Sequence, residues 1–255
     1  QMWLDFSAIP REQAEARFPT ILDSCSEFGL NPLEQPIPVA PAAHYWTGGV
    51  ATDLSASTSL PGLYAVGEVA CTGLHGANRL ASNSLMECLV FAHRMSSIDL
   101  GPITSKHSTS TPRNCNLFLG DGESSKGLIE RIDALRHLCW RTAGVDRGLS
   151  GLRSGLERIR RETNHMSSQE LLRELFDQDH QESRLLSDGS RRDLNLLLDL
   201  HHRLLTSRLM LEACLFRRES RGGHFRTDAP KMLPHWHCHS RQSKALGIVT
   251  RAVRM

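Results

Sequence analysis

Two kinds of apolar spacing divide the sequence. In the first hundred residues, Arg11 to Phe28 has apolar or small residues at mixed helical spacing, between a proline and a glycine, which predicts a surface helix. Gly62 to Glu68 is a short apolar run bounded by glycines and predicts a buried strand. Gly73 to Ser84 is dense in Gly, Asn and Ser and precedes an apolar helical pattern, Leu85 to Met95. We therefore expect a loop that leads into a helix.

Helical spacing dominates the second half. Apolar residues three and four apart, interleaved with Arg and Glu, predict a small helical bundle. The expected helices are Leu128–Trp140, Leu149–Arg161, Gln169–Phe176 and Asp193–Phe216. Residues 101–125 are rich in Ser, Thr, Pro, Gly and Asn and predict a linker between residues 36–100 and a bundle over 126–230. Residues 231–255 lose the periodicity, so we expect an irregular tail there.

Composition excludes several classes of partner. The 255 residues include 30 Lys and Arg against 28 Asp and Glu, a formal charge of +2, which does not indicate binding to nucleic acid or to a membrane surface. No apolar stretch is long enough to span a bilayer. The seven cysteines form no CxxC pair, which favours a reducing cytoplasm. The first residues already read as the interior of a strand, so we expect a fragment of a longer protein.

The segment from Thr72 to Leu85 is the most informative one for function. Its glycines permit tight backbone turns, and the guanidinium of Arg79 matches a carboxylate bidentately. Ser82 or Ser84 is placed to cap the following helix, whose amino-terminal end favours negative charge. A capped helix with a surface arginine is an equally weighted alternative.

Two further positions are weaker candidates when each is taken alone. His44 lies shortly before the Gly48-Gly49 pair, where backbone can approach a ligand closely, although such a histidine is more often a turn residue. Glu68 follows the predicted strand and could accept hydrogen bonds from ligand hydroxyls, or it could be an ordinary strand-ending carboxylate.

Two other segments imitate known motifs. Residues 119–127 begin like a dinucleotide-binding turn, but the third glycine is misplaced and the acidic pair would repel phosphates. The run from His235 to His239 holds several metal-ligand types without a second cluster at zinc-site spacing, so we expect no metal site.

Four motifs, in their order and spacing, resemble the L-aspartate oxidase family, within the succinate dehydrogenase and fumarate reductase flavoprotein group. These motifs are His44–Gly49, Gly62–Glu68, Thr72–Cys88 and Arg218–Phe225. The resemblance implies the carboxyl-terminal part of a Rossmann-like α/β FAD-binding domain, followed by an all-α bundle. Residues 1–35 would then be the tail of the family's capping domain. The last motif resembles a latch for which packing, including that of His224, is favoured over chemistry.

The resemblance also implies roles for single residues. Glu68 would hold the ribityl part of FAD, Ser84 and Leu85 would meet the flavin end, and His44 and Arg79 would bind a substrate carboxylate. The family's proton-shuttle arginine and its GxGxxG turn would lie upstream, so no catalytic residue is assigned here and we expect the chain alone to be inactive.

The implied reaction oxidises L-aspartate, or another C4 dicarboxylate, to iminoaspartate, with oxygen or fumarate as acceptor. This is the first step of de novo NAD biosynthesis, with hand-over of the product to quinolinate synthase. Two alternatives stay open. One is a succinate dehydrogenase or fumarate reductase flavoprotein, whose corresponding loop typically reads Ser-Val-His-Gly. The other is an inactive helical interaction module, supported by Arg160, Arg161, Arg217 and Arg218.

Overall fold

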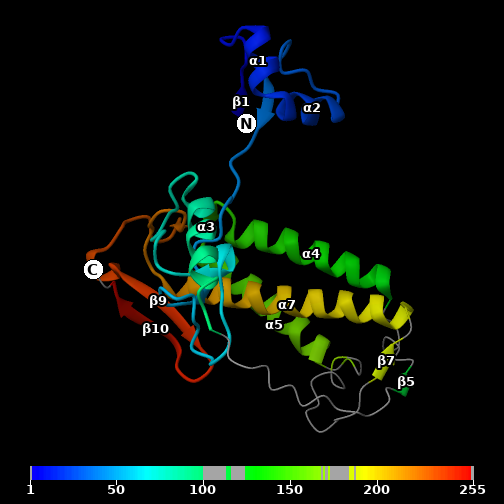
Figure 1. Ribbon diagram of the computed structural model, residues 1–255, viewed down its shortest axis with the longest axis vertical. Coiled ribbons are helices and arrows are strands. Elements are labelled where there is room, and N and C mark those ends of the chain that lie inside the picture. Colours follow the sequence, from blue (N-terminus) through cyan, green and yellow to red (C-terminus); the bar gives the residue numbers. More distant parts are fainter. Residues whose placement is uncertain are drawn as a thin grey trace. The chain divides into compact units, whose positions relative to one another are not determined.

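The chain forms two compact units, Gln1–Ala43 and His44–Met255. The computed structural model (Figure 1) describes residues 2–99, 113–115, 124–167, 169, 172, 184–186 and 188–253. The finer division predicted from the sequence remains a prediction, and most of the expected linker lies outside the described residues. Among the described residues, no helix combines the length and the apolar character needed to cross a membrane.

The first unit is a two-stranded sheet with two short helices. Strand β1 (Met2–Leu4) pairs antiparallel with β2 (Ile37–Val39), and helices α1 (Arg11–Arg17) and α2 (Pro19–Glu27) lie between them in the sequence. The single helix expected over residues 11–28 is therefore wrong. Its break falls at Phe18, because the residue before a proline is disfavoured in helical conformation.

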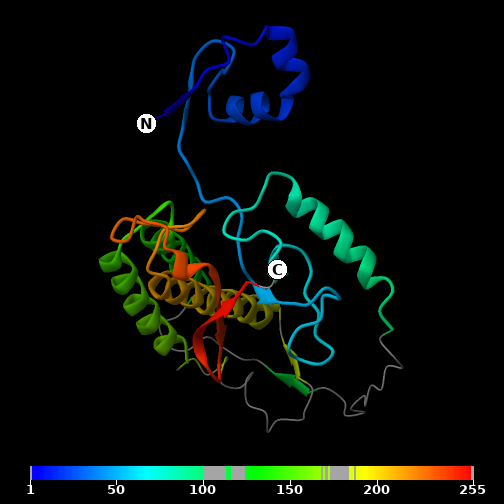
Figure 2. The ribbon, with the colours of Figure 1, turned by 90° about the vertical axis from the view of Figure 1, so that its left-hand side faces the viewer.

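The second unit begins with a small α/β region. Strand β3 (Val50–Ala51) pairs in parallel with β4 (Ala70–Cys71), which follows the 3-10 turn η1 (Gly67–Val69), and helix α3 (Asn83–Met95) comes after the glycine-rich loop. The loop and the helix confirm the prediction. Figure 2 shows α3 as a separate helix beside this region.

The strand expected over residues 62–68 is wrong in position. Tyr64 makes only an isolated bridge to Ser57, and the regular pairing begins at Ala70. Gly67 has φ +79°, outside the extended region, and so interrupts the strand just before η1. A run of apolar residues identified the segment but not the point where its backbone becomes extended.

Gly49 permits the pairing of β3 with β4. A Cβ atom on Gly49 would lie 2.3 Å from the carbonyl oxygen of Val69, and Gly49 has φ +126°. Both the close approach of the backbones and the positive φ require glycine here. The paired glycines noted in the sequence thus have a structural role.

Three long helices form the main hydrophobic core. They are α4 (Ser125–Ala143), α5 (Leu149–Ser167) and α7 (Asp188–Phe216), which pack side by side (Figure 1). Their buried apolar residues recur at helical spacing, as in Leu128, Ile132, Leu135 and Leu138 of α4. The prediction of a helical bundle is confirmed, although each helix extends beyond the predicted bounds. The helix expected over 169–176 lies outside the described residues except for positions 169 and 172.

Short elements connect the bundle to the rest of the unit. Ser124 caps α4 by accepting a hydrogen bond from the Gly127 amide, so the end of the discarded 119–127 motif is a helix start. Strands β5 (Arg113–Cys115) and β7 (Arg184–Leu186) pair in parallel, as do β6 (Asp146–Arg147) and β8 (Phe225–Arg226).

The carboxyl-terminal segment is ordered into a hairpin. After the 3-10 turn η2 (Pro234–Trp236), strand β9 (Cys238–Ser243) pairs antiparallel with β10 (Gly247–Ala252). The irregular tail expected over residues 231–255 is therefore wrong for the described part. Neither strand has a fully buried side chain, so the sequence lacks the apolar alternation by which a strand is recognised.

A matched pair of glycines in α5 tests the packing of the bundle. A Cβ on Gly155 would lie 2.9 Å from Leu211 Cδ2 and 3.0 Å from Thr142 Cγ2, whereas one on Gly151 would have nothing within 4 Å. We expect Gly155→Leu to lower the free energy of unfolding by about 1–3 kcal/mol through overpacking. Urea denaturation followed by circular dichroism measures the change. Gly151→Leu is the control, and equal effects of both substitutions would contradict the packing.

Candidate functional site

The loop between β4 and α3 folds through two left-handed glycines. Gly73 has φ +88° and Gly76 has φ +56°, values that glycine adopts without strain. The Gly76 amide donates to the carbonyl of Gly73 and the Asn78 amide to that of His75. The chain therefore turns sharply twice before it reaches Arg79.

A buried carboxylate on α3 accepts hydrogen bonds from two side chains of this loop. Glu87 of α3 accepts hydrogen bonds from the Thr72 hydroxyl at 2.5 Å and from Nε2 of His75 at 2.8 Å. Because an ionised carboxylate only accepts, His75 donates from Nε2. Both side chains of the His75–Glu87 pair are almost fully buried. Sequence reasoning missed this pair; the available signal was the four-residue spacing of Glu87 and Phe91, the two buried residues of α3.

Two contacts of the Tyr45 ring connect His75 to Arg79. The ring of Tyr45 meets the His75 ring edge-on at 5.2 Å between centroids, and the Arg79 guanidinium lies over the Tyr45 ring, 4.9 Å from its centroid. Burial raises the pKa of Tyr45, assisted by the charges of Glu87, Glu68 and Cys88 and opposed by that of Arg79. Tyr45 therefore acts as a neutral platform that orients the guanidinium.

The other predicted residues lie around the same segment. Glu68 accepts a hydrogen bond from the Trp46 amide at 2.8 Å, so residues 44–46 contact both Glu68 and Arg79. His44 is exposed and immediately precedes Tyr45. Three motifs that are separated in the sequence thus meet, although the roles assigned to the individual residues remain predictions.

The start of α3 differs from expectation in one respect. Ser82 is the N-cap residue, but its φ is +67° and its side chain makes no capping hydrogen bond. The carbonyl of Ser82 instead accepts from the amides of Leu85 and Met86, so side-chain capping by Ser82 is wrong. Ser84 is half-buried and Leu85 is exposed, both in the first turn. The amino-terminal end of a 13-residue helix carries the partial positive charge expected from the sequence.

Unpaired polar atoms indicate that this region fits a polar ligand. The Nε of Arg79, the Nδ1 of His75 and the hydroxyl of Thr52 are buried without a hydrogen-bond partner. Each such atom costs on the order of 1–3 kcal/mol, so native structures supply a partner. An anionic ligand would satisfy the Nε of Arg79, whereas the Nδ1 of His75 accepts and would need a hydroxyl or another donor. This agrees with a carboxylate substrate and a hydroxyl-bearing flavin.

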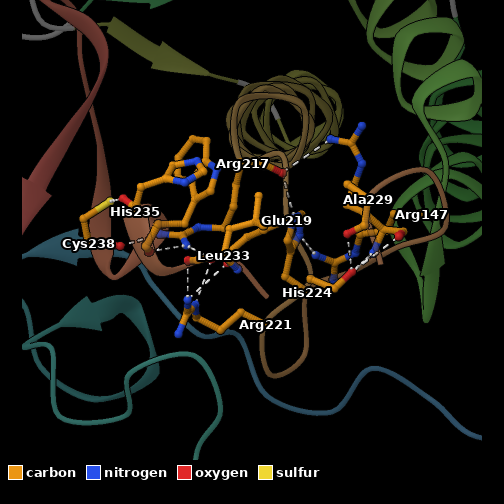
Figure 3. A network of polar contacts seen from close by, with 12 residues as sticks. Arg147, Arg217, Glu219, Arg221, His224, Ala229, Leu233, His235 and Cys238 are labelled. Carbon is orange, nitrogen blue, oxygen red and sulfur yellow. Dashed lines mark hydrogen bonds and ion pairs between the residues drawn. The ribbon is translucent and has the colours of Figure 1, made fainter. Parts of the chain in front are cut away.

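A second buried carboxylate lies beyond the end of α7 (Figure 3). Glu219 is fully buried and accepts hydrogen bonds from the guanidinium groups of Arg217 and Arg221 and from the Leu233 amide. Burial alone would raise the pKa of Glu219, but the bonds from Arg221, Leu233 and Arg217 lower it to about 2. Glu219 is therefore ionised at neutral pH and joins three segments of the chain.

This arrangement weakens the hypothesis of a helical interaction module. Arg217 contacts Glu219, the carbonyls of Trp236 and Cys238, and the ring of Trp236, so its charge is used internally. Arg160 lies 3.8 Å from Glu212. Two of the four arginines that supported a basic surface thus have acidic partners.

His224 is held as a neutral side chain in the same network. Its Nδ1 lies 2.8 Å from Nη1 of Arg147 and its Nε2 lies 3.1 Å from the carbonyl of Arg217. An arginine can only donate, so Nδ1 accepts and Nε2 carries the proton. Burial, together with the charges of Arg147, Arg226 and Arg217, lowers the pKa of His224 to about 4.

Arg226 completes the network by terminating α7. It is almost fully buried, pairs with Asp228, and donates to the carbonyl of Cys214 at 2.7 Å. A guanidinium at the carboxyl-terminal end of a helix satisfies carbonyls that have no partner within the helix. The long helix therefore ends on a charged clamp formed by residues later in the chain.

The histidine-rich run does not form a cluster. Among the described residues, no group of three or more His, Cys, Asp or Glu side chains is placed to hold a metal ion. His235 lies in η2 against Trp236, whereas His239 lies in β9. The run instead supplies backbone carbonyls to Arg217.

The chain has the fold of the FAD-dependent flavoproteins of the fumarate reductase and succinate dehydrogenase group. Residues 1–85 match the family of FAD binding domains, and residues 132–254 match the fumarate reductase flavoprotein C-terminal family. A chain of E. coli quinol fumarate reductase has a TM-score of 0.72 at 22% identity, covering 99% of this chain and 44% of that one. A second quinol-fumarate reductase has a TM-score of 0.70 at 23% identity, covering 99% and 45%. These results confirm the predicted fold class.

Within that group, the chain belongs to the L-aspartate oxidase family. It is 40% identical to the L-aspartate oxidase of Synechocystis sp. over 94% of this chain and 43% of that protein. Identity to the Rhodospirillum rubrum L-aspartate oxidase is also 40%, over 85% of this chain and 67% of that protein. The Pseudomonas aeruginosa enzyme is 35% identical over 91% and 40%. The chain thus spans less than half the length of the Synechocystis and Pseudomonas relatives.

Replacement of Glu219 tests the charged network. Glu219→Gln leaves two partly buried guanidinium groups without a full counter-charge, and we expect the free energy of unfolding to fall by about 3–5 kcal/mol. Glu130→Gln, which removes an exposed pair with Lys126 on α4, should cost less than about 1 kcal/mol. Urea titration of both variants measures this, and a Glu219 variant as stable as the Glu130 variant would contradict the network.

The pH dependence of stability tests the burial of His224. Since the pKa of His224 falls from 6.5 to about 4 on folding, the unfolded chain binds the proton more readily in that interval. The part of the folding free energy that depends on a neutral His224 is fully present above about pH 6.5. It is lost as the pH falls towards 4. Urea midpoints across this window should decline less steeply in His224→Asn than in the unsubstituted protein. His137→Asn, at an exposed site on α4, should keep the original slope.

Proposed function

We propose that this chain forms the carboxyl-terminal part of the FAD site and one part of the substrate site of an L-aspartate oxidase. The reaction oxidises L-aspartate to iminoaspartate, with oxygen or fumarate as the electron acceptor, in the first step of de novo NAD biosynthesis. Membership of the L-aspartate oxidase family supports this proposal. The chain covers only part of its relatives, and the family's proton-shuttle arginine is expected outside it.

The observation that carries the proposal is the fixed guanidinium of Arg79. It lies over the Tyr45 ring, and its Nε is buried without a protein partner. A planar guanidinium in one orientation binds a carboxylate bidentately and loses little side-chain entropy on binding. Arg79 therefore suits one end of a C4 dicarboxylate.

His44 supplies a second group for the substrate. It lies beside Tyr45 on an exposed segment, which leaves its imidazole free to donate to a carboxylate when protonated. Two donors on one anionic group orient the substrate and fix the direction of its reacting C–H bond. When bound, FAD would accept the hydride from that carbon.

The remaining predicted residues would hold the flavin. Glu68 is exposed and would accept from the ribityl hydroxyls, while the Trp46 amide holds one of its oxygens in place. Ser84 and Leu85 present backbone amides in the first turn of α3, where the helix dipole favours the electron-rich end of a reduced flavin.

We also propose that the protein acts in the cytoplasm. Cysteine usage favours the cytoplasm, where the described cysteines would remain as free thiols. Iminoaspartate would pass to quinolinate synthase.

Substitution of Arg79 tests the proposal. In the full-length, flavin-loaded protein, Arg79→Lys retains the charge but loses the planar fork, so we expect kcat/KM for L-aspartate to fall by about a hundredfold or more. Hydrogen peroxide release, measured against L-aspartate concentration, gives this value. Arg94→Lys, on the later part of α3, should change it less than about threefold.

The same assay separates the alternatives. Faster oxidation of succinate than of L-aspartate would favour the hypothesis of a succinate dehydrogenase or fumarate reductase flavoprotein. It would contradict the proposal. An Arg79→Lys variant as active as the Arg94→Lys variant would remove Arg79 from the substrate site.

A further inference from the structure

The turn Arg221–His224 lies directly against the loop that carries Arg79. The Gly223 amide donates a hydrogen bond to the carbonyl of Ala77 at 3.2 Å. Gly222 has φ +56°, and a Cβ atom on it would lie 2.2 Å from the same carbonyl oxygen. The two backbones therefore touch where only glycine leaves room, 145 positions apart in the sequence.

The turn itself is rigidly held. The amides and carbonyls of Arg221 and His224 exchange two hydrogen bonds, of 2.8 and 3.0 Å. The Arg221 side chain is bound by buried Glu219 and by the carbonyl of Leu233, and the His224 ring lies between Arg147 and a backbone carbonyl. Both ends of the turn are thus fixed by partners in the network around Glu219.

The loop has anchors of its own on either side of the contact. His75 is held by Glu87, two residues before Ala77, and the Arg79 guanidinium rests on Tyr45, two residues after it. The Ala77 carbonyl lies between these anchors and receives its hydrogen bond from the turn. A displacement of Ala77 would therefore move the backbone that sets the direction of Arg79.

We propose that the Arg221–His224 turn is a positioning element that holds the Arg79 loop in its binding conformation. Gly222 and Gly223 make the contact, and Glu219 and Arg221 keep the turn in place. The consequence for the substrate rests on the proposed function, whereas the mechanical coupling of turn and loop does not. A motif for which the sequence favoured packing over chemistry thereby acquires a defined effect on a binding residue.

Hydrogen–deuterium exchange tests the coupling with matched glycines. Gly222→Ala should raise the exchange of amides within residues 72–82 by about tenfold, because the added methyl group cannot fit against Ala77. Gly223→Ala, where a Cβ would have nothing within 4 Å, should leave them unchanged. Gly247→Ala controls for positive φ alone, because Gly247 has φ +64° with open space around it. Unchanged exchange in a folded Gly222→Ala protein, or an equal rise in Gly247→Ala, would overturn the proposal.

A second variant decides the question if Gly222→Ala does not fold. Arg221→Lys keeps the charge near Glu219 but loses the two-pronged hydrogen bond, and adds no bulk at the contact. Exchange within residues 72–82 should rise while the amides of α4 and α5 stay protected. Protection of the loop at the original level in this variant would refute the coupling.

Binding of succinate to the full-length, flavin-loaded protein gives the functional readout. Calorimetric titration should show affinity weakened by about tenfold in Arg221→Lys and within about twofold of the original in Gly223→Ala, because small misplacements of a binding group cost up to about a hundredfold. Equal affinities in the two variants would contradict control of Arg79 by the turn. Absence of succinate binding in the unsubstituted protein would instead refute the proposed function, and the exchange comparison would still stand.

Discussion

The interaction of the ionised Glu219 carboxylate with its donors is the one on which the course of the chain after α7 depends. A buried charge is tolerated only with partners that replace its lost hydration, and Arg217, Arg221 and the Leu233 amide supply them. These partners come from the end of α7, from the following turn and from the segment that leads to the hairpin. One acid therefore fixes the course of the chain after the long helix, together with the edge-on contact between Phe216 and Trp236.

Glu87 has the corresponding role in the α/β region. It is a buried residue of α3 and accepts hydrogen bonds from Thr72 and His75 of the glycine-rich loop. Each of the two carboxylates thus organises a short segment of backbone whose apolar side chains are not buried in the core. Loops held in this way can present a guanidinium in a single orientation, which is what recognition of a carboxylate requires.

The sequence predicted those features that depend on local pattern. Helices α3, α4, α5 and α7 follow from apolar periodicity, and the Arg79 loop follows from its glycines and the family resemblance. The hairpin after Pro230 was not predicted, because its side chains lack apolar alternation. The break at Phe18 was not predicted either, because the helical spacing of apolar residues continues across Pro19. The partners of Glu87 and Glu219 arise from packing between distant segments, about which local pattern carries no information.

The contact between Gly222 and Ala77 is made by main-chain atoms on both sides. The contact therefore restricts the two positions differently. Position 222 has room for glycine alone, while the residue at 77 contributes a carbonyl that every amino acid possesses. The side chain at 77 does not take part in the hydrogen bond, which joins the Gly223 amide to the Ala77 carbonyl. A substitution at 222 therefore acts on the Arg79 loop through added bulk, whereas a substitution at 77 leaves the accepting carbonyl in place.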